Sequence, residues 1–139
     1  MKFALALPAL FVVAACHSTP AAPCPDTQAV VTKVAAAHGD VLRLTVHAVP
    51  PGGGAMCGIA STSPERLGRV SDSEDHRAID TGEIVVLDEP GAVDYSVPVR
   101  QKDGKFTAVV GVTLKSGGDP AALRASAVAI AAEVAGQMK

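Results

Sequence analysis

The sequence is poor in aromatic residues, in charge of one sign and in long apolar runs. Only 3% of its 139 residues are aromatic, and its formal net charge is -2. Disordered chains and nucleic-acid-binding surfaces carry a large excess of one charge, so we expect neither disorder nor a nucleic-acid partner. No apolar run reaches the roughly 18 to 20 residues of a membrane-spanning helix. The length allows one folded domain, since single domains commonly have roughly 100 to 200 residues.

The N-terminus has the features of an export signal. A cationic start at Met1 and Lys2 precedes apolar residues 3–15, and small residues lead directly into Cys16. The run Val13-Ala14-Ala15-Cys16 resembles the lipobox of bacterial lipoproteins. This resemblance implies that the chain is cleaved before Cys16 and that a lipid on the cysteine sulfur anchors it to a membrane. An ordinary secretory signal with an incidental cysteine is the alternative.

The lipobox resemblance also divides the chain and places it in the cell. The predicted segments are a signal peptide at 1–15, a linker at 16–25 that begins with the lipidated cysteine, and a folded domain at 26–139. His17 occupies the position at which inner-membrane lipoproteins typically have an aspartate. In a Gram-negative cell, the resemblance therefore implies an outer-membrane location facing the periplasm.

Export would place the remaining cysteines, Cys24 and Cys57, in an oxidising compartment, where a pair tends to form a disulfide. A bridge between them would close a loop of about 34 residues, which the chain-entropy model values at roughly 3 to 4 kcal/mol. Two free thiols, or a metal or redox site, are the alternatives. The four histidines do not repeat a zinc spacing. We therefore predict a disulfide between Cys24 and Cys57, and neither a metal nor a cofactor.

The spacing of apolar residues alternates between the helical period and the two-residue period of a strand. Glycine and proline clusters separate the periodic segments and mark loops, notably at 50–54. The predicted elements are a helix at 27–38, strands at 41–49 and 56–61, a short helix closed by Gly82, strands at 83–87, 93–99 and 105–114, and a last helix that begins at Pro120.

Two local patterns predict how elements begin and join. Ser71 and Glu74 have capping-box spacing, in which the hydroxyl and the carboxylate accept hydrogen bonds from exposed amides at a helix start. Asp103 and Gly104 tolerate the positive backbone angles of a primed turn, so we expect a tight hairpin there. The element order is that of an α+β domain with one antiparallel sheet and helices over it.

The ordered pattern from Ile59 to Leu114 resembles the PAS-like Cache sensor domains found outside bacterial membranes. The resemblance lies in the runs IASTSPERLGRVSDSEDHRAIDTGE and VDYSVPVRQKDGKFTAVVGVTL. It implies a five-stranded antiparallel sheet, flanked by N-terminal and C-terminal helices, whose one face and adjoining loops enclose a small-metabolite pocket. Two family features are missing from this sequence: transmembrane helices with an internal output domain, and the aromatic and arginine residues with which some relatives hold amino acids.

Four residues are candidates for ligand contact: His47, Ser61, Arg69 and Tyr95. His47 lies on the less apolar face of the 41–49 strand, with Arg43 beside it, whereas Ser61 and Arg69 flank the loop that resembles the family's pocket wall. We expect a cavity between the sheet and residues 61–81 that His47 and Tyr95 enter from one face. A solvated strand face for His47 and a core position for Tyr95 are the alternatives.

Acidic residues gather in the middle of the sequence. Between Asp72 and Asp94 lie eight carboxylates against Arg77 alone. A cation or a cationic partner could use such a patch, but the spacing of EF-hand calcium ligands is absent. The sequence-based interpretation is a solvated acidic surface.

These patterns favour a ligand-binding protein over an enzyme. No serine lies in a nucleophile elbow, and the glycines at 52–54 are not followed by the lysine and serine or threonine of a phosphate loop. We expect a membrane-anchored envelope lipoprotein with a Cache-like domain that binds a small polar metabolite. The alternative is a non-enzymatic scaffold that uses the same fold to dock on an envelope protein without a ligand.

Overall fold

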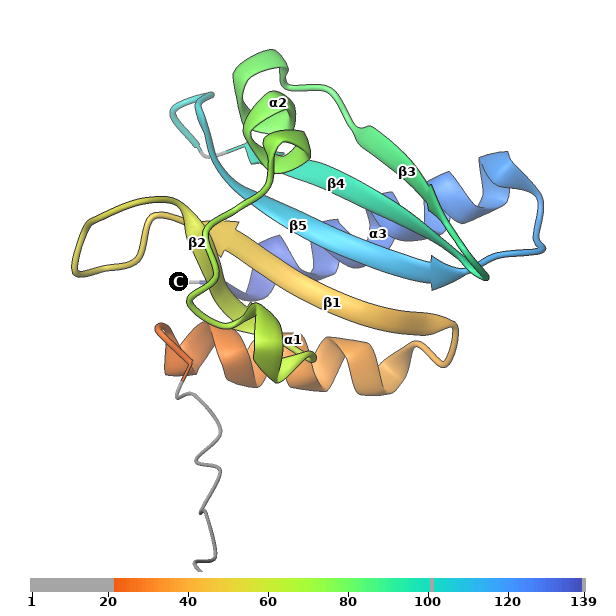
Figure 1. Ribbon diagram of the computed structural model, residues 1–139, viewed down its shortest axis with the longest axis horizontal. Helices are drawn as coiled ribbons and strands as arrows, with labels where there is room; N and C mark the ends of the chain where they lie inside the picture. The colour runs from red at the N-terminus through yellow and green to blue at the C-terminus, as the bar shows by residue number, and fades with distance from the viewer. Residues whose placement is uncertain (1–21, 101, 139) are drawn as a thin grey trace, which may run out of the picture.

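The computed structural model describes residues 22–100 and 102–138 (Figure 1). The predicted signal peptide, the lipidated Cys16 and most of the linker lie outside these residues. In chain order, the elements are α1 (Pro25–Ala37), β1 (Val41–Ala48), β2 (Cys57–Ser61), the 3-10 turn η1 (Pro64–Arg66), α2 (Ser73–Thr81), β3 (Val85–Glu89), β4 (Ala92–Arg100), β5 (Phe106–Lys115) and α3 (Pro120–Gln137). None of the described helices combines the length and the apolar character needed to cross a membrane.

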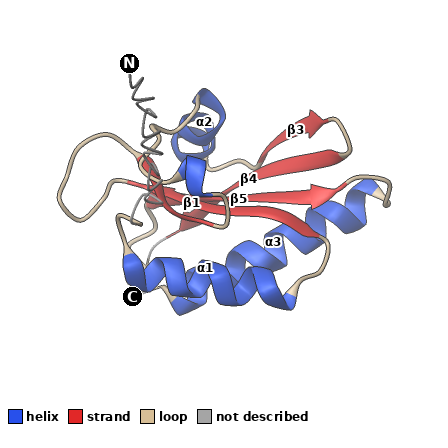
Figure 2. Ribbon diagram, turned by 60° about the horizontal axis from the view of Figure 1, so that its bottom comes forward, coloured by secondary structure: helices blue, strands red, loops and turns tan. Residues whose placement is uncertain are grey.

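The strands form one antiparallel sheet in the order β2-β1-β5-β4-β3. Helices α1 and α3 pack side by side on one face of the sheet, and α2 lies over the opposite face (Figure 2). This arrangement confirms the predicted α+β fold, with its five-stranded sheet and its flanking N-terminal and C-terminal helices.

Alternation along the strands gives the sheet an apolar face and a polar one. On β1, Leu44 and Val46 are fully buried and belong to the core between the sheet and helices α1 and α3. Each such buried side chain stabilises the fold by roughly 1.5 to 3 kcal/mol. Because successive side chains point to opposite faces, the intervening Arg43, Thr45 and His47 lie on the side that α2 covers. The polar face therefore becomes available for a site.

Helix α2 begins one residue later than the sequence predicted. Its N-cap is Asp72, and its capping box pairs Asp72 with Asp75 rather than Ser71 with Glu74. The backbone N–H of Asp72 donates to Asp75 Oδ2 at 3.3 Å, while the Ser71 hydroxyl is held by His47 Nδ1 at 2.9 Å. Gly82 ends the helix with a φ of 71°, as predicted.

The β4–β5 connection also differs from the prediction. Gly104 has a φ of 85°, but no non-glycine residue in the described ranges has a positive φ. Asp103 therefore does not form the primed turn; its Oδ1 instead accepts a hydrogen bond from the Lys105 backbone at 3.0 Å. The strands end at Arg100 and resume at Phe106, so the connection is a longer loop.

The predicted disulfide is absent, since Cys24 and Cys57 are both free thiols in the structure. Cys24 Sγ lies 3.0 Å from Thr27 Oγ1, and Cys57 is buried on β2. The backbone N–H of Cys24 donates to the Ile59 carbonyl at 3.2 Å. The start of α1 is thus joined to β2 by a main-chain hydrogen bond, which holds the two elements together without a covalent bridge.

Candidate functional site

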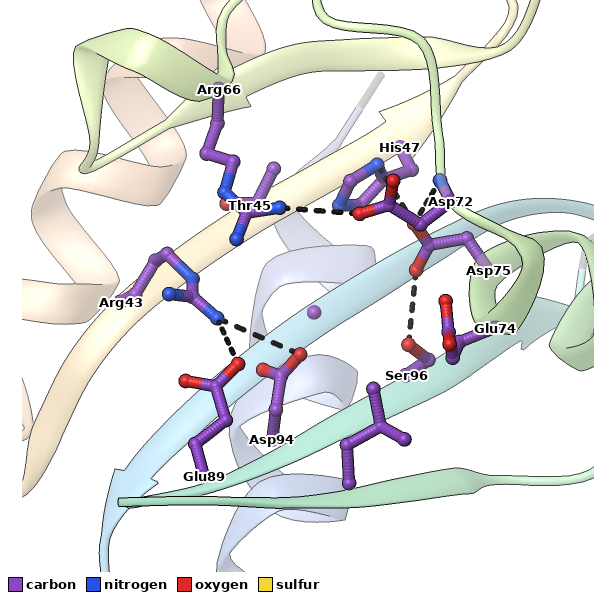
Figure 3. Close-up of a pocket in the computed structure, with 12 residues that line it drawn as sticks. Arg43, Thr45, His47, Arg66, Asp72, Glu74, Asp75, Glu89, Asp94 and Ser96 are labelled. Atoms are coloured by element: carbon purple, nitrogen blue, oxygen red, sulfur yellow. Dashed lines mark hydrogen bonds and ion pairs between the residues drawn. The ribbon is translucent and has the colours of Figure 1, made fainter. Parts of the chain in front are cut away.

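A small polar pocket lies between the sheet and the segment that runs from η1 into α2 (Figure 3). Its volume is about 60 Å³, which corresponds to roughly two water molecules at liquid density. The sheet side comes from β1, β3, β4 and β5, and the opposite wall comes from residues 66–75. The lining residues are Arg43, Thr45, His47, Arg66, Asp72, Glu74, Asp75, Leu87, Glu89, Asp94, Ser96 and Gly111.

His47 is one of two buried titratable groups that line this pocket, with 8% of its surface exposed, and Asp75 is the other. Its Nδ1 lies 2.9 Å from the Ser71 hydroxyl and 3.3 Å from Asp75 Oδ2. Its Nε2 has no hydrogen-bond partner among the described residues. Every fully buried side-chain nitrogen or oxygen of these residues does have a partner. Nε2 therefore keeps some exposure, and the space beside it is the pocket.

Burial lowers the pKa of His47 below its ordinary value of 6.5, because removal from water penalises the charged imidazolium. The Asp75 carboxylate opposes this shift, and the Arg66 guanidinium adds to it. The ring is therefore neutral at pH 7. Because the Asp75 carboxylate faces Nδ1 at 3.3 Å, its negative charge favours a hydrogen on Nδ1 over a lone pair there. This tautomer leaves the lone pair of the ring on Nε2.

Asp75 connects α2 to two strands of the sheet, β1 and β4. Its Oδ1 accepts a hydrogen bond from the Ser96 hydroxyl at 3.0 Å, and its Oδ2 lies beside His47 and the Asp72 amide. The Asp75 side chain is 8% exposed, so these partners replace the water that a carboxylate would otherwise bind. The network fixes the positions of His47 on β1 and Ser96 on β4, the two strands that flank β5.

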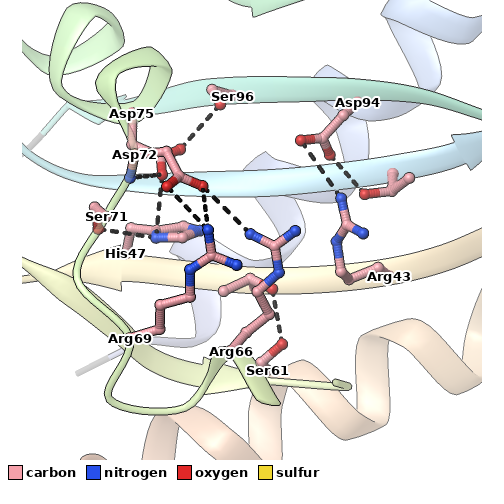
Figure 4. Close-up of polar contacts among 12 residues, drawn as sticks. Arg43, His47, Ser61, Arg66, Arg69, Ser71, Asp72, Asp75, Asp94 and Ser96 are labelled. Carbon is pink, nitrogen blue, oxygen red and sulfur yellow. Dashed lines mark hydrogen bonds and ion pairs between the residues drawn. The ribbon is translucent and has the colours of Figure 1, made fainter. Parts of the chain in front are cut away.

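Ion pairs surround this buried centre (Figure 4). Arg43 Nη2 lies 3.2 Å from Glu89 Oε1 and 3.7 Å from Asp94 Oδ2. On the opposite wall, Arg66 Nη1 lies 3.5 Å from Asp72 Oδ2. Both arginines therefore direct their charge toward carboxylates that also line the pocket.

Gly111 keeps the pocket floor open at the centre of β5. A Cβ atom at this position would lie 3.6 Å from His47 Nε2 and 3.8 Å from its Cδ2. These are ordinary van der Waals distances, so an alanine would fit the backbone while occupying space beside the imidazole. Glycine thus leaves the unpartnered ring nitrogen accessible.

The four residues predicted from the sequence have different positions in the structure. His47 lines the pocket. Buried Ser61 lies beside the pocket on β2, with its hydroxyl 2.7 Å from Thr45 Oγ1, and exposed Arg69 lies 3.2 Å from the pocket residue Asp72. Tyr95 is on the opposite face, in the core against α1 and α3. The expectation that Tyr95 and His47 share one face was wrong.

The acidic stretch also has a different role from the solvated surface that the sequence indicated. Five of its eight carboxylates line the pocket: Asp72, Glu74, Asp75, Glu89 and Asp94. The sequence pattern did indicate two polar strand faces, because Asp94 and Ser96 alternate with apolar residues on one strand. Arg43, Thr45 and His47 do so on another. Pairing these two polar stripes required the sheet order.

The comparisons with known proteins show similarity in structure but not in sequence. No protein-family model and no curated protein matches the chain. The GAF domain of an Acinetobacter phosphoenolpyruvate-protein phosphotransferase superposes with a TM-score of 0.58 at 19% identity, over 86% of this chain and 83% of that one. The fold is PAS-like, of the GAF type.

A second solved structure has the same fold. The type II free methionine-R-sulfoxide reductase from Thermoplasma acidophilum gives a TM-score of 0.51 at 16% identity, over 81% of this chain and 92% of that one. At such low identities the likeness concerns the arrangement of helices and strands. The chemistry of the pocket has to be argued from its own side chains.

Proposed function

We propose that the chain is a binding module that holds a small polar molecule in the pocket around His47. The observation that carries this proposal is a polar cavity between the sheet and residues 66–75, with an unpartnered nitrogen of a buried imidazole beside it. Ligand sites are concave, and well-placed polar groups in them fix the orientation of the ligand. The GAF-type fold of the neighbouring structures agrees with such a role.

We propose a non-enzymatic role, although one structural neighbour is a sulfoxide reductase. Thiols are the protein groups that exchange electrons with sulfur compounds most readily. Neither Cys24 nor Cys57 is among the residues that line the pocket. The lining groups suit hydrogen bonding and ion pairing, which are the means of binding a polar ligand reversibly.

The membrane anchor and the narrower relation to Cache sensors rest on sequence. We propose that Cys16 is lipidated and holds the domain at the outer membrane, facing the periplasm, where the pocket would sample small metabolites. Cys16→Ser should yield an unprocessed or soluble protein in a fractionation of the native cells. A Cys16→Ser protein that is still processed and membrane-bound would contradict the anchor and leave the pocket proposal intact.

A thermal-shift screen of small polar metabolites tests the binding function. A ligand at 100 times its dissociation constant adds about 2.7 kcal/mol to native stability, so true ligands should raise the midpoint clearly. Gly111→Ala should abolish the response because its methyl group occupies the pocket floor. Gly39→Ala is the matched control, since a Cβ atom there meets nothing within 4 Å.

Three results are informative. Ligands that stabilise the wild type and Gly39→Ala but not Gly111→Ala support binding in this pocket. Equal stabilisation of all three proteins would place the ligand elsewhere. No stabilisation of the wild type by any metabolite would overturn the binding function.

The second candidate function, a docking scaffold, draws support from the outer surface of α3. This surface consists of alanines together with Arg124 and Val128, and Val128 is 40% exposed. The scaffold hypothesis predicts that no metabolite stabilises the protein and that Val128→Asp abolishes assembly with an envelope protein in sedimentation experiments. Glu65→Gln, on the exposed η1 turn, is the control for an unrelated surface change.

A further inference from the structure

The charges that line the pocket indicate the sign of the charge on its ligand. The pocket is lined by five carboxylates but by only two guanidinium groups, and the His47 ring is neutral. An anion entering this space would approach more negative than positive charge. A cation would gain from the same arrangement, and more strongly than in water because the pocket is partly shielded from solvent.

The two arginines are already engaged by carboxylates. Arg43 lies against Glu89 and Asp94, and Arg66 against Asp72. Thr113 also donates to Asp94 at 2.6 Å. These contacts leave little uncompensated positive charge with which the pocket could recruit an anionic ligand.

Two acceptors remain unused. Glu74 lines the pocket, and its side chain makes no hydrogen bond or ion pair with any described residue. The second acceptor is His47 Nε2, which has a lone pair in the tautomer whose hydrogen is on Nδ1, the nitrogen that lies 3.3 Å from the Asp75 carboxylate. The space beside them therefore has hydrogen-bond acceptors that lack donors.

A protonated primary amine supplies what these acceptors lack. Its three N–H groups donate and accept nothing, and its positive charge offsets the excess of carboxylates. A metal cation needs at least three converging ligand atoms at about 2.0 to 2.6 Å, and no such group of His, Cys, Asp or Glu exists in the described part of the chain. The volume of about 60 Å³ admits an ammonium group with a short substituent.

We propose that the pocket binds the protonated amino group of a small primary amine, which donates hydrogen bonds to His47 Nε2 and to the Glu74 carboxylate. This inference rests on the proposed function and narrows it to one class of ligand. It also assigns Glu74, which the sequence indicated only as a capping residue, as a ligand-contacting residue.

Methylammonium, tetramethylammonium and acetate test the inference on the folded protein at pH 7.5. The ring-nitrogen NMR signals of His47 report hydrogen bonding at Nε2. Methylammonium should shift the Nε2 signal saturably, whereas tetramethylammonium, a cation without N–H groups, and acetate, an anion, should not. Glu74→Gln should weaken methylammonium binding about tenfold, as expected from the loss of one charged hydrogen bond.

Glu65→Gln is the matched control, because Glu65 lies on η1 outside the pocket lining. It should bind methylammonium like the wild type. Absence of a saturable shift with methylammonium, an equal response to tetramethylammonium, or an unchanged affinity in Glu74→Gln would overturn the amine assignment. A metabolite that has no amino group and binds the wild type but not Gly111→Ala would also overturn the amine assignment. That result would leave the proposed binding function intact.

Discussion

Removal of the Asp75 carboxylate should destabilise the whole domain as well as the pocket. The side chain accepts hydrogen bonds from Ser96 and the Asp72 amide and contacts His47 Nδ1, while it is 8% exposed. Hydrogen bonds to a charged acceptor contribute about 1.5 to 3 kcal/mol each, and the burial cost of the carboxylate offsets part of their sum. We expect Asp75→Ala to lower the free energy of unfolding by about 3 kcal/mol, a large share of the 5 to 15 kcal/mol typical of a domain.

Urea denaturation followed by far-ultraviolet circular dichroism measures this change. Ser96→Ala alone should cost about 1 kcal/mol. In the double variant the two effects should not add, because each single change already removes the shared hydrogen bond. Asp80→Ala, at an exposed position of the same helix, should stay within about 0.5 kcal/mol of the wild type. A loss below about 1 kcal/mol in Asp75→Ala, or full additivity with Ser96→Ala, would refute the proposed network.

Three further predictions follow from the geometry. Because burial lowers the pKa of His47, the imidazole takes up a proton in the unfolded chain before it does so in the folded one as the pH falls through about 6.5. The free energy of unfolding should therefore decrease on acidification below that pH. In urea titrations, His47→Gln should reduce this pH dependence, whereas His76→Gln, at an exposed position, should not. Tyr95→Phe should leave ligand affinity unchanged in calorimetry, whereas Tyr95→Ala should cost about 3 to 5 kcal/mol of stability because the side chain is core; weakened binding in Tyr95→Phe would contradict the face assignment. Gly58→Ala should weaken ligand binding, because a Cβ atom there collides with the Arg66 carbonyl oxygen and displaces the pocket wall formed by residues 66–75. An unchanged ligand affinity in Gly58→Ala would contradict this role of the wall.

The sheet and its helices could be predicted because local patterns dictated them. Alternating residues in 41–49 and 93–99 and the helical stripe after Pro120 each follow from one buried face. The boundaries of α2 could not be fixed in this way, since Ser71 and Asp72 are both good cap residues. The structure uses Asp72 for the helix and Ser71 for His47, and that choice depends on a contact across 24 positions of sequence.

The pocket depended on the order of strands, which no local pattern contains. His47 was recognisable on the polar face of its strand, but Asp94 and Ser96 lie near it only because β5 separates β1 from β4. Tyr95 was expected to enter the pocket together with His47 as one of its polar groups, with a core position as the alternative. Its neighbours Asp94 and Ser96 occupy the pocket face, so the two-residue period of the strand directs Tyr95 into the core.

Backbone amide NMR can show whether this molecule binds a ligand on the polar face of its sheet. Metabolites that raise the thermal midpoint should be titrated into uniformly labelled protein. We expect saturable shifts at Thr45, Ser96, Gly111 and residues 66–75, with the outer surface of α3 unaffected. Shifts confined to α3, or an unperturbed pocket in the presence of a stabilising metabolite, would contradict binding at this face.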